Sequence, residues 1–327
     1  MNDLKNKKSQ IISPPIFFVH TPKTAGTSFR SALETVIDED AIIRNYGNES
    51  VMTSALVKPH TSSSPVDKYR LCKAVSTLPI ELIVGHVGLH TYLMLTNTDK
   101  IVSFLRNPVE QVISHWRHYV KYLNYDGGLE DFCWDGRFSN LQSRLLSGAP
   151  IEMIGHLLIT ERYALSLSLF NSDYGTELDA LRCNQNIEKT SDCYEVSDAQ
   201  RALIIEKNQR DIRLYDNALS LLERRIKLMK SGDEWTYGVC HPANPKGIIN
   251  GWAYQRSHLP VEIELLSNGK VVAETQAVDY RPNLNVFRPP RKSCIGFQFK
   301  MKQVVPSGQL SCRVKSTGQE LFPPLRM

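Results

Sequence analysis

The sequence predicts an α/β fold in which a mainly parallel sheet is flanked by helices, followed by a small all-β sandwich domain. In the first part of the chain, apolar runs of strand length alternate with amphipathic helical patterns, which is the alternation that builds parallel sheets. After about Trp235 apolar residues recur at every second position, and Asn268-Gly269 is a strong hairpin signal between two such runs. We therefore expect residues 1 to 232 to form one domain and residues 233 to 327 the other.

The first strand of this pattern leads into a short polar turn. Ile16 to Val19 are apolar, the turn that follows contains Lys23 and Gly26, and apolar residues then recur at helical spacing from about Thr27. A strand, a tight turn and a helix N-terminus present backbone N–H groups and a positive dipole end to an anion. The unit predicts a P-loop-like, phosphate-binding turn to which Lys23 adds a point charge. The alternative is an ordinary junction with a solvated lysine.

A second apolar strand, residues 101 to 105, runs into another helix. Asn107 suits the N-cap of this helix and Pro108 its first position. Ser114 lies off the apolar stripe, on the polar face, so we expect its hydroxyl to be free to meet a ligand. Taken alone, Arg106 and Ser114 also fit a structural ion-pair residue and a solvated helix serine.

A third strand, residues 81 to 85, ends at His86. A neutral imidazole titrates in the physiological range and is suited to take a proton from a hydroxyl group. The alternative for this histidine is a hydrogen-bonded structural role. His20 and His90 are weaker candidates for the same task.

Three of these elements resemble one enzyme family. Pro22-Lys23-Thr24-Ala25-Gly26-Thr27-Ser28 resembles the PKTGGTS-type loop of sulfotransferases that use 3′-phosphoadenosine 5′-phosphosulfate, especially carbohydrate sulfotransferases related to the heparan sulfate 2-O- and 6-O-enzymes, with alanine at the first glycine. Arg106 followed eight residues later by Ser114 resembles the family's site for the 3′-phosphate, and Gly85-His86-Val87 resembles the segment that carries its catalytic base. The likeness spans about residues 15 to 230.

The resemblance implies a role for each residue. Lys23 would stabilise charge on the bridging oxygen, His86 would deprotonate the acceptor, and Arg106 with Ser114 would hold the 3′-phosphate. The rest of the loop would bind the 5′-phosphosulfate of the donor through Thr24, Ala25, Gly26, Thr27 and Ser28. Arg144, in a segment that resembles the N-x-Q-x-R of bacterial members, is a further cofactor or acceptor contact, with a salt-bridging helix arginine as its alternative. The arrangement requires no metal, and its nucleotide product is 3′,5′-adenosine bisphosphate.

The amino-acid composition excludes several other classes of protein. The chain has 327 residues, 42% of them apolar, and a net charge of +5 without a long Lys/Arg run, so nucleic-acid binding is not indicated. Its seven cysteines are widely spaced without a C-x-x-C pair and imply neither a zinc site nor a disulfide framework. No apolar stretch suggests a signal peptide or a membrane span, and we expect a cytoplasmic protein.

Two further stretches have predicted conformations. Residues 58 to 69 are rich in Ser, Thr and Pro and are expected to form a loop that could border the acceptor site, or equally a disordered connection. Residues 199 to 230 have the pattern of a helical run. In the C-terminal part, Gly251-Trp252-Ala253 with Arg281 and Gly296-Phe297 resembles a β-module appended to bacterial glycosyltransferases and sulfotransferases. The alternative is a purely structural sandwich.

The function predicted is transfer of a sulfuryl group to a hydroxyl of a glycan or glycan precursor. One alternative is a P-loop kinase or NTPase, which the strand-loop-helix unit favours, although Lys23 precedes Gly26 rather than following the last glycine. The other is a non-catalytic glycan-binding protein in which the β-domain acts alone. The acceptor, the position sulfated and the oligomeric state are left open by the sequence.

Overall fold

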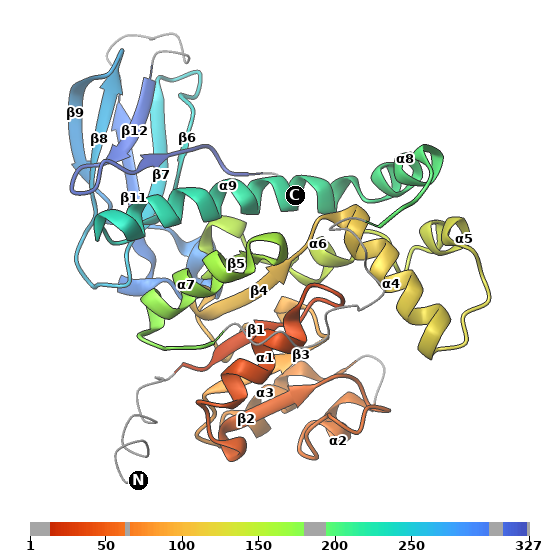
Figure 1. Cartoon of the computed structure of the whole chain (residues 1–327). Coiled ribbons are helices and arrows are strands. Elements are labelled where there is room, and N and C mark those ends of the chain that lie inside the picture. Colours follow the sequence, from red (N-terminus) through yellow and green to blue (C-terminus); the bar gives the residue numbers. More distant parts are fainter. Residues whose placement is uncertain (1–13, 63–65, 180–193, 301–309, 326–327) are drawn as a thin grey trace.

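The structure, a computed structural model, describes residues 14–62, 66–179, 194–300 and 310–325. A five-stranded sheet occupies the first part, with the order β2-β3-β1-β4-β5 and every neighbouring pair parallel (Figure 1). Its strands are β1 (Ile16–Val19), β2 (Ile42–Asn45), β3 (Leu82–Gly85), β4 (Ile101–Leu105) and β5 (His156–Ile159). The α/β class expected from the sequence is confirmed.

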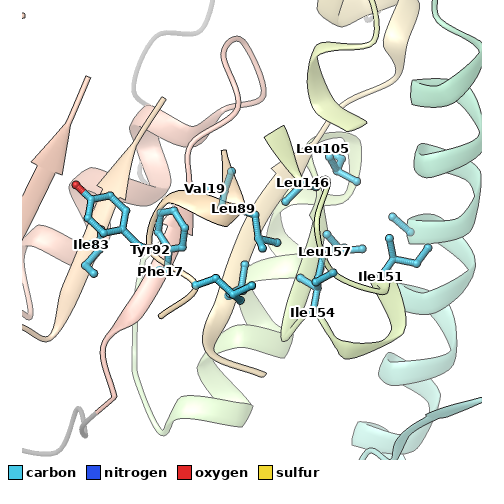
Figure 2. Close-up of a cluster of buried hydrophobic side chains, with 14 of the residues drawn as sticks. Phe17, Val19, Ile83, Leu89, Tyr92, Leu105, Leu146, Ile151, Ile154 and Leu157 are labelled. Carbon is cyan, nitrogen blue, oxygen red and sulfur yellow. The ribbon is translucent and has the colours of Figure 1, made fainter. Parts of the chain in front are cut away.

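Helices cover both faces of this sheet. They are α1 (Gly26–Glu34), α2 (Lys58–Thr61), α3 (Lys68–Val75), α4 (Pro108–Tyr122), α5 (Leu129–Trp134), α6 (Leu141–Leu145), α7 (Tyr163–Tyr174), α8 (Asp198–Lys207) and α9 (Gln209–Ser231). In β1, Phe17 and Val19 point into a core that α3 and α9 complete, while Ile16 and Phe18 pack on the other face with α1 and α7. Figure 2 shows the first of these cores. This alternation follows from the period of two along a strand.

The strand order places a topological switch point between β1 and β4. The chain leaves β1 toward β2 and β3 on one side, and after β4 it continues to β5 on the other side. In open α/β sheets, ligands bind at the carboxyl ends of the strands at such a point, because the loops that leave the two strands diverge there. The loop that carries Lys23 leaves β1 at this place, and Arg106 follows β4.

One sequence expectation about helices is confirmed with a break, and another was wrong. Residues 199 to 230 are helical as predicted, but they form two helices, α8 and α9, that meet at Asn208, which has φ −118° and ψ 32°. The Asn208 side chain accepts the Asn140 backbone N–H at 2.8 Å, so a tertiary contact stabilises the break. The segment expected as a loop at 58 to 69 contains α2 and the start of α3, where Asp67 caps the helix by accepting the Arg70 N–H at 3.0 Å.

The C-terminal part contains two four-stranded antiparallel sheets, in the orders β10-β11-β7-β6 and β13-β12-β8-β9. Asn268 and Gly269 have φ of 49° and 77° in the tight turn between β8 and β9, as the hairpin signal predicted. The inner faces enclose a common core that includes Ile263, Phe297 and Val314. The strands are β6 (Tyr237–His241), β7 (Ile248–Tyr254), β8 (Glu262–Ser267), β9 (Lys270–Gln276), β10 (Asp279–Tyr280), β11 (Cys294–Lys300), β12 (Leu310–Val314) and β13 (Glu320–Leu321).

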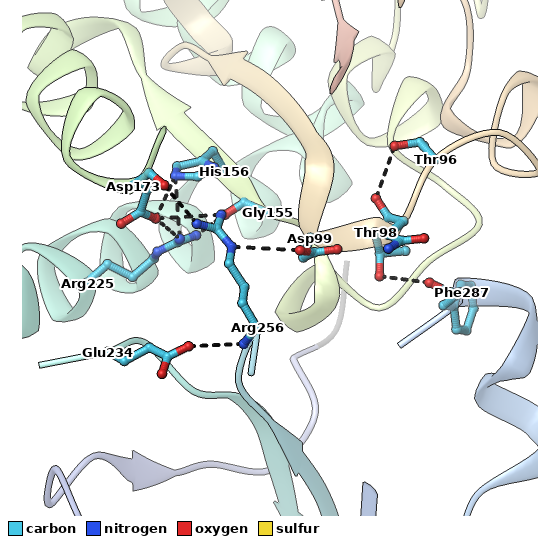
Figure 3. Close-up of polar contacts among 11 residues, drawn as sticks. Thr96, Thr98, Asp99, Gly155, His156, Asp173, Arg225, Glu234, Arg256 and Phe287 are labelled. Atoms are coloured by element: carbon cyan, nitrogen blue, oxygen red, sulfur yellow. Dashed lines mark hydrogen bonds and ion pairs between the residues drawn. The ribbon is translucent and has the colours of Figure 1, made fainter. Parts of the chain in front are cut away.

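A polar network of buried and partly buried side chains joins the two parts of the molecule (Figure 3). The Asp173 carboxylate accepts from His156 Nε2 at 3.0 Å and from Arg225 at 2.8 Å. Arg256, which follows β7, lies 3.9 Å from the same carboxylate and 3.7 Å from that of Asp99. Asp99 precedes β4 and His156 begins β5, so this network lies at the amino ends of the parallel strands, opposite the edge where Lys23 and Arg106 emerge.

Candidate active site

The turn after β1 has a backbone shaped for close packing around α1. Lys23 and Ala25 both have left-handed φ, 65° and 61°, and Ala25 is the N-cap of α1 without a side-chain capping bond. The Thr24 hydroxyl donates to the Thr21 carbonyl at 2.9 Å and is fully buried, so it stabilises the turn from within. Gly26 and Ser28 are buried, whereas Lys23 and Thr27 keep partial exposure. Helices leave their first N–H groups without intrahelical partners, so this turn presents donors to an anion.

Gly26 is required by its neighbour His20. A Cβ atom at this position would lie 2.2 Å from Cδ2 and 2.5 Å from Nε2 of His20. The His20 ring is buried and its Nδ1 lies 2.9 Å from the Tyr46 hydroxyl, so it has little freedom to retreat. The single glycine of the turn therefore lets α1 begin directly against this histidine.

Arg106 lies against the same turn. Its guanidinium donates to the Lys23 carbonyl at 3.3 Å and is 3.5 Å from Glu110, while its side chain is 14% exposed. The predicted cap of α4 is confirmed, since Asn107 Oδ1 accepts the Val109 N–H at 3.0 Å and Pro108 begins the helix. The structure thus brings Lys23 and Arg106 together from the ends of two adjacent strands.

Two glutamines that the sequence analysis did not select fix this arrangement. Gln142 Oε1 accepts the Arg106 N–H and Gln142 Nε2 donates to the Arg106 carbonyl, both at 2.9 Å. Gln111 Nε2 donates to the Pro22 carbonyl at 3.0 Å, which ties α4 to the turn. Gln142 is the glutamine of the N-x-Q-x-R segment, but that resemblance selected Arg144, and no local signal predicted that either glutamine would bond to backbone distant in sequence.

Tyr194 is a further residue missed from the sequence. Its ring centroid lies 5.6 Å from the Arg106 guanidinium carbon and 4.5 Å from that of Arg117. Its backbone N–H donates to Glu110 at 3.0 Å. An aromatic ring therefore lies between two arginines beside the turn, and no sequence signal marked it.

Two predicted site residues have surroundings that differ from expectation. Ser114 was expected on an exposed face, but it is 8% exposed, because the first turns of α4 are buried on all sides and include Glu110, Gln111 and His115. Arg144, on α6, donates to the backbone carbonyls of Gly136 and Arg137. Among the hydrogen bonds of the described residues, those of Arg144 link it to the segment before α6 and not to the Lys23 turn.

His86 emerges from β3 with a defined tautomer. Its Nδ1 lies 2.5 Å from the His20 carbonyl oxygen, which only accepts hydrogen bonds, so Nδ1 carries the proton and Nε2 of the neutral ring keeps its lone pair. The ring centroid is 4.5 Å from that of His20 and 4.7 Å from that of Tyr46. The residue retains exposed surface. This geometry is suited to a general base that acts through Nε2.

The electrostatics of this region favour an anion. Burial lowers the pKa of Lys23, with a smaller contribution in the same direction from Arg106, although Tyr194 opposes the shift. Loss of hydration in the surrounding protein lowers the pKa of His86, although its hydrogen bond to His20 opposes this. Burial, with contributions from His118 and Lys23, lowers the pKa of His115 to about 4. Cationic groups repel one another here, and an anionic ligand would relieve that repulsion.

The described ranges contain no cluster of three or more His, Cys, Asp or Glu residues arranged to hold a metal ion. In those same ranges, no helix combines the length and apolar character needed to cross a membrane.

The sequence matches no protein-family model and no curated protein. Among solved structures, the chain is similar to the crystal structure of a sulfotransferase from Alicyclobacillus acidocaldarius, with 15% identity and a TM-score of 0.34 over 66% of this chain and 97% of that one. It is also similar to the mouse sulfotransferase SULT7A1 in complex with PAP, with 14% identity and a TM-score of 0.30 over 64% of this chain and 69% of that one. Both likenesses are too distant to assign residues or chemistry.

Proposed function

We propose that this protein is a sulfotransferase that uses 3′-phosphoadenosine 5′-phosphosulfate and a hydroxyl acceptor of the glycan or glycan-precursor class. The observation that carries the proposal is that Lys23, Arg106 and His86 follow the carboxyl ends of three adjacent parallel strands, with Arg106 bonded to the Lys23 carbonyl and Nδ1 of His86 bonded to the His20 carbonyl. The glycan class of the acceptor rests on the resemblance of the Lys23 loop and of Gly85-His86-Val87 to carbohydrate sulfotransferases.

The residues present fit a donor that carries two anionic groups. Lys23 and the start of α1 supply a point charge and backbone donors for one anion. Arg106 supplies a planar guanidinium, already oriented by Glu110 and by the Lys23 carbonyl, for a second one. When bound, the donor supplies an activated sulfuryl group. Transfer of such a group depends on alignment and charge neutralisation more than on covalent help from the protein.

His86 is assigned the acid–base role. With Nδ1 held by the His20 carbonyl, Nε2 accepts the proton of the acceptor hydroxyl as that oxygen becomes the nucleophile. The lowered pKa of His86 keeps the ring neutral at neutral pH, so the base form is present without prior deprotonation. Tyr46 and His20 pack around the ring and limit its rotation.

Calorimetry with two nucleotides tests the donor. Each charge-assisted hydrogen bond to a 3′-phosphate contributes about 1.5 to 3 kcal/mol, so 3′,5′-adenosine bisphosphate should bind at least roughly tenfold more tightly than 5′-AMP. Arg106→Ala should abolish most of this preference and leave the affinity for 5′-AMP nearly unchanged. Arg137→Ala is the matched control, because that arginine pairs with Asp135 at the surface.

Equal affinity of the wild-type protein for the two nucleotides would remove the support for a 3′-phosphate site and favour an NTP-binding protein instead. Failure to bind either nucleotide would favour the glycan-binding alternative. Once the donor is established, incubation with sulfur-labelled donor and a panel of bacterial glycans tests the acceptor class. A preference for acceptors without sugar hydroxyls would contradict it.

A further inference from the structure

Two cysteines from opposite sheets of the β-sandwich meet in its core. Cys240 belongs to β6 and Cys312 to β12, and their Sγ atoms are 3.0 Å apart. Both side chains are buried, with Cys240 8% and Cys312 1% exposed. The surrounding core is apolar and includes Ile263, Leu265 and Phe297. The two residues are 72 positions apart, so sequence spacing alone gave no reason to pair them.

The other described cysteines lack this arrangement. Cys72 donates to the Thr91 carbonyl at 3.4 Å, and Cys133 lies in the core between α4 and α5. Cys294 is on β11 and only partly buried. Among the described residues, the contact between Cys240 and Cys312 is the one sulfur–sulfur hydrogen bond.

We propose that Cys240 and Cys312 are a redox-active pair that forms a disulfide between the two sheets when a low-molecular-weight disulfide such as oxidised glutathione is supplied. The sulfurs need to approach by only about 1 Å to reach bonding distance. The Cys240 thiolate attacks one sulfur of glutathione disulfide, forming a mixed disulfide and releasing one glutathione thiolate. Cys312, after losing its proton, attacks Cys240 Sγ and expels the second glutathione. Two thiols are oxidised and one glutathione disulfide is reduced.

The surroundings assign the order of these steps. The contact with Cys240 and burial in the core both raise the pKa of Cys312, whose side chain is only 1% exposed. Cys240 is also the more exposed of the two, on the outer strand β6. Cys240 is therefore the attacking thiol and Cys312 the resolving one.

The bond would close a long loop that contains β7 to β11, because these strands lie between the two cysteines in sequence. Closing a loop of this length restricts the unfolded chain strongly and stabilises the fold. We expect the oxidised full-length protein to unfold at a temperature higher by roughly 5 to 10 °C than the reduced protein.

The test compares the full-length chain after equilibration in reduced or oxidised glutathione, with refolding from denaturant to give the buried thiols access. After alkylation of free thiols, peptide mapping should find the Cys240–Cys312 peptide and the loss of two hydrogen atoms. Melting temperatures are then measured in both states for wild type and for Cys240→Ala, Cys312→Ala and Cys294→Ala.

The difference in melting temperature between the oxidised and reduced states should vanish in the first two variants and persist in Cys294→Ala. Because each variant is compared with its own reduced form, a cavity left by the substitution does not affect the readout. Free thiols at both positions after oxidative refolding, an unresolved glutathione adduct on Cys240, or a bond from either cysteine to a different one would each overturn the proposal.

Discussion

Substitution of Gly26 by alanine should damage the candidate site through steric contact alone. The new Cβ would lie 2.2 Å from His20 Cδ2, so the His20 ring must retreat by more than about 1 Å to restore an ordinary contact. That movement would break its 2.9 Å hydrogen bond to Tyr46 and crowd His86, whose ring centroid is 4.5 Å away.

Overpacking of this kind costs about 1 to 3 kcal/mol, and the lost hydrogen bond about 1 kcal/mol more. The higher helix propensity of alanine offsets less than about 1 kcal/mol of this loss of stability. We expect the melting temperature of Gly26→Ala to fall by roughly 5 to 10 °C and its affinity for 3′,5′-adenosine bisphosphate to fall at least about tenfold.

Differential scanning fluorimetry and calorimetry measure the two effects. Gly136→Ala is the control, because a Cβ at Gly136 meets no atom within 4 Å. If Gly26→Ala melts with the wild-type protein and binds the nucleotide normally, the close approach of α1 to His20 is not a requirement of the site.

Four further outcomes are expected. His86→Ala should abolish transfer but keep nucleotide affinity, with His90→Ala as the control; a large loss of nucleotide affinity in His86→Ala would place His86 in the nucleotide site instead. Wild-type activity should decline on acidification with a midpoint below pH 6.5, because loss of hydration lowers the pKa of His86. Ala25 has a left-handed φ of 61°, which strains an alanine but not a glycine, so Ala25→Gly should raise the melting temperature by about 2 to 4 °C. A lower melting temperature would show that the backbone at Ala25 is not strained. Burial lowers the pKa of His156 to about 3, so between pH 3 and 6.5 the unfolded chain binds a proton that the folded chain does not. The free energy of unfolding, measured by urea denaturation, should therefore fall as the pH is lowered from 6.5 toward 3. His156→Gln should flatten this pH dependence, and an unchanged dependence would exclude His156 as its source. Residues 1 to 232 alone should retain nucleotide binding, because the β-domain contacts the amino edge of the parallel sheet and the candidate site lies at the carboxyl edge. An insoluble fragment, or a folded one that binds no nucleotide, would show that the domain boundary at residue 232 is wrong.

The parts of the molecule that local chemistry determines were predictable from the sequence. The cap formed by Asn107 and Pro108 and the turn at Asn268-Gly269 depend on residues within a few positions of one another, and both are confirmed. The parallel sheet was predictable because strands that alternate with helices have few other ways to bury their apolar faces. In the loop, Ala25 stands where the PKTGGTS motif has its first glycine, and the left-handed φ of Ala25 explains why glycine suits that position.

The parts that long-range contacts determine were not predictable. The exposure expected for Ser114 was wrong because helical periodicity describes a helix with one buried face, whereas the start of α4 is enclosed on all sides. Gln142 reaches Arg106 across 36 positions and Tyr194 reaches Glu110 across 84, and no single-sequence pattern encodes such pairs. The division at Asn208 likewise depends on Asn140, which is 68 positions away.

The polar network has a consequence for exchanging modules between proteins. Asp99 and Asp173 belong to the α/β part, whereas Arg256 belongs to the β-domain. A foreign β-domain joined at the short linker after α9 would bring no arginine to this place and would leave two carboxylates near the junction with Arg225 as the remaining guanidinium partner. The side chains of Arg256, Asp99 and Asp173 are 28%, 16% and 23% exposed, so solvent screens these pairs and their loss costs less than the loss of a fully buried ion pair. A chimera should therefore be more stable when the arginine is transplanted together with the sheets.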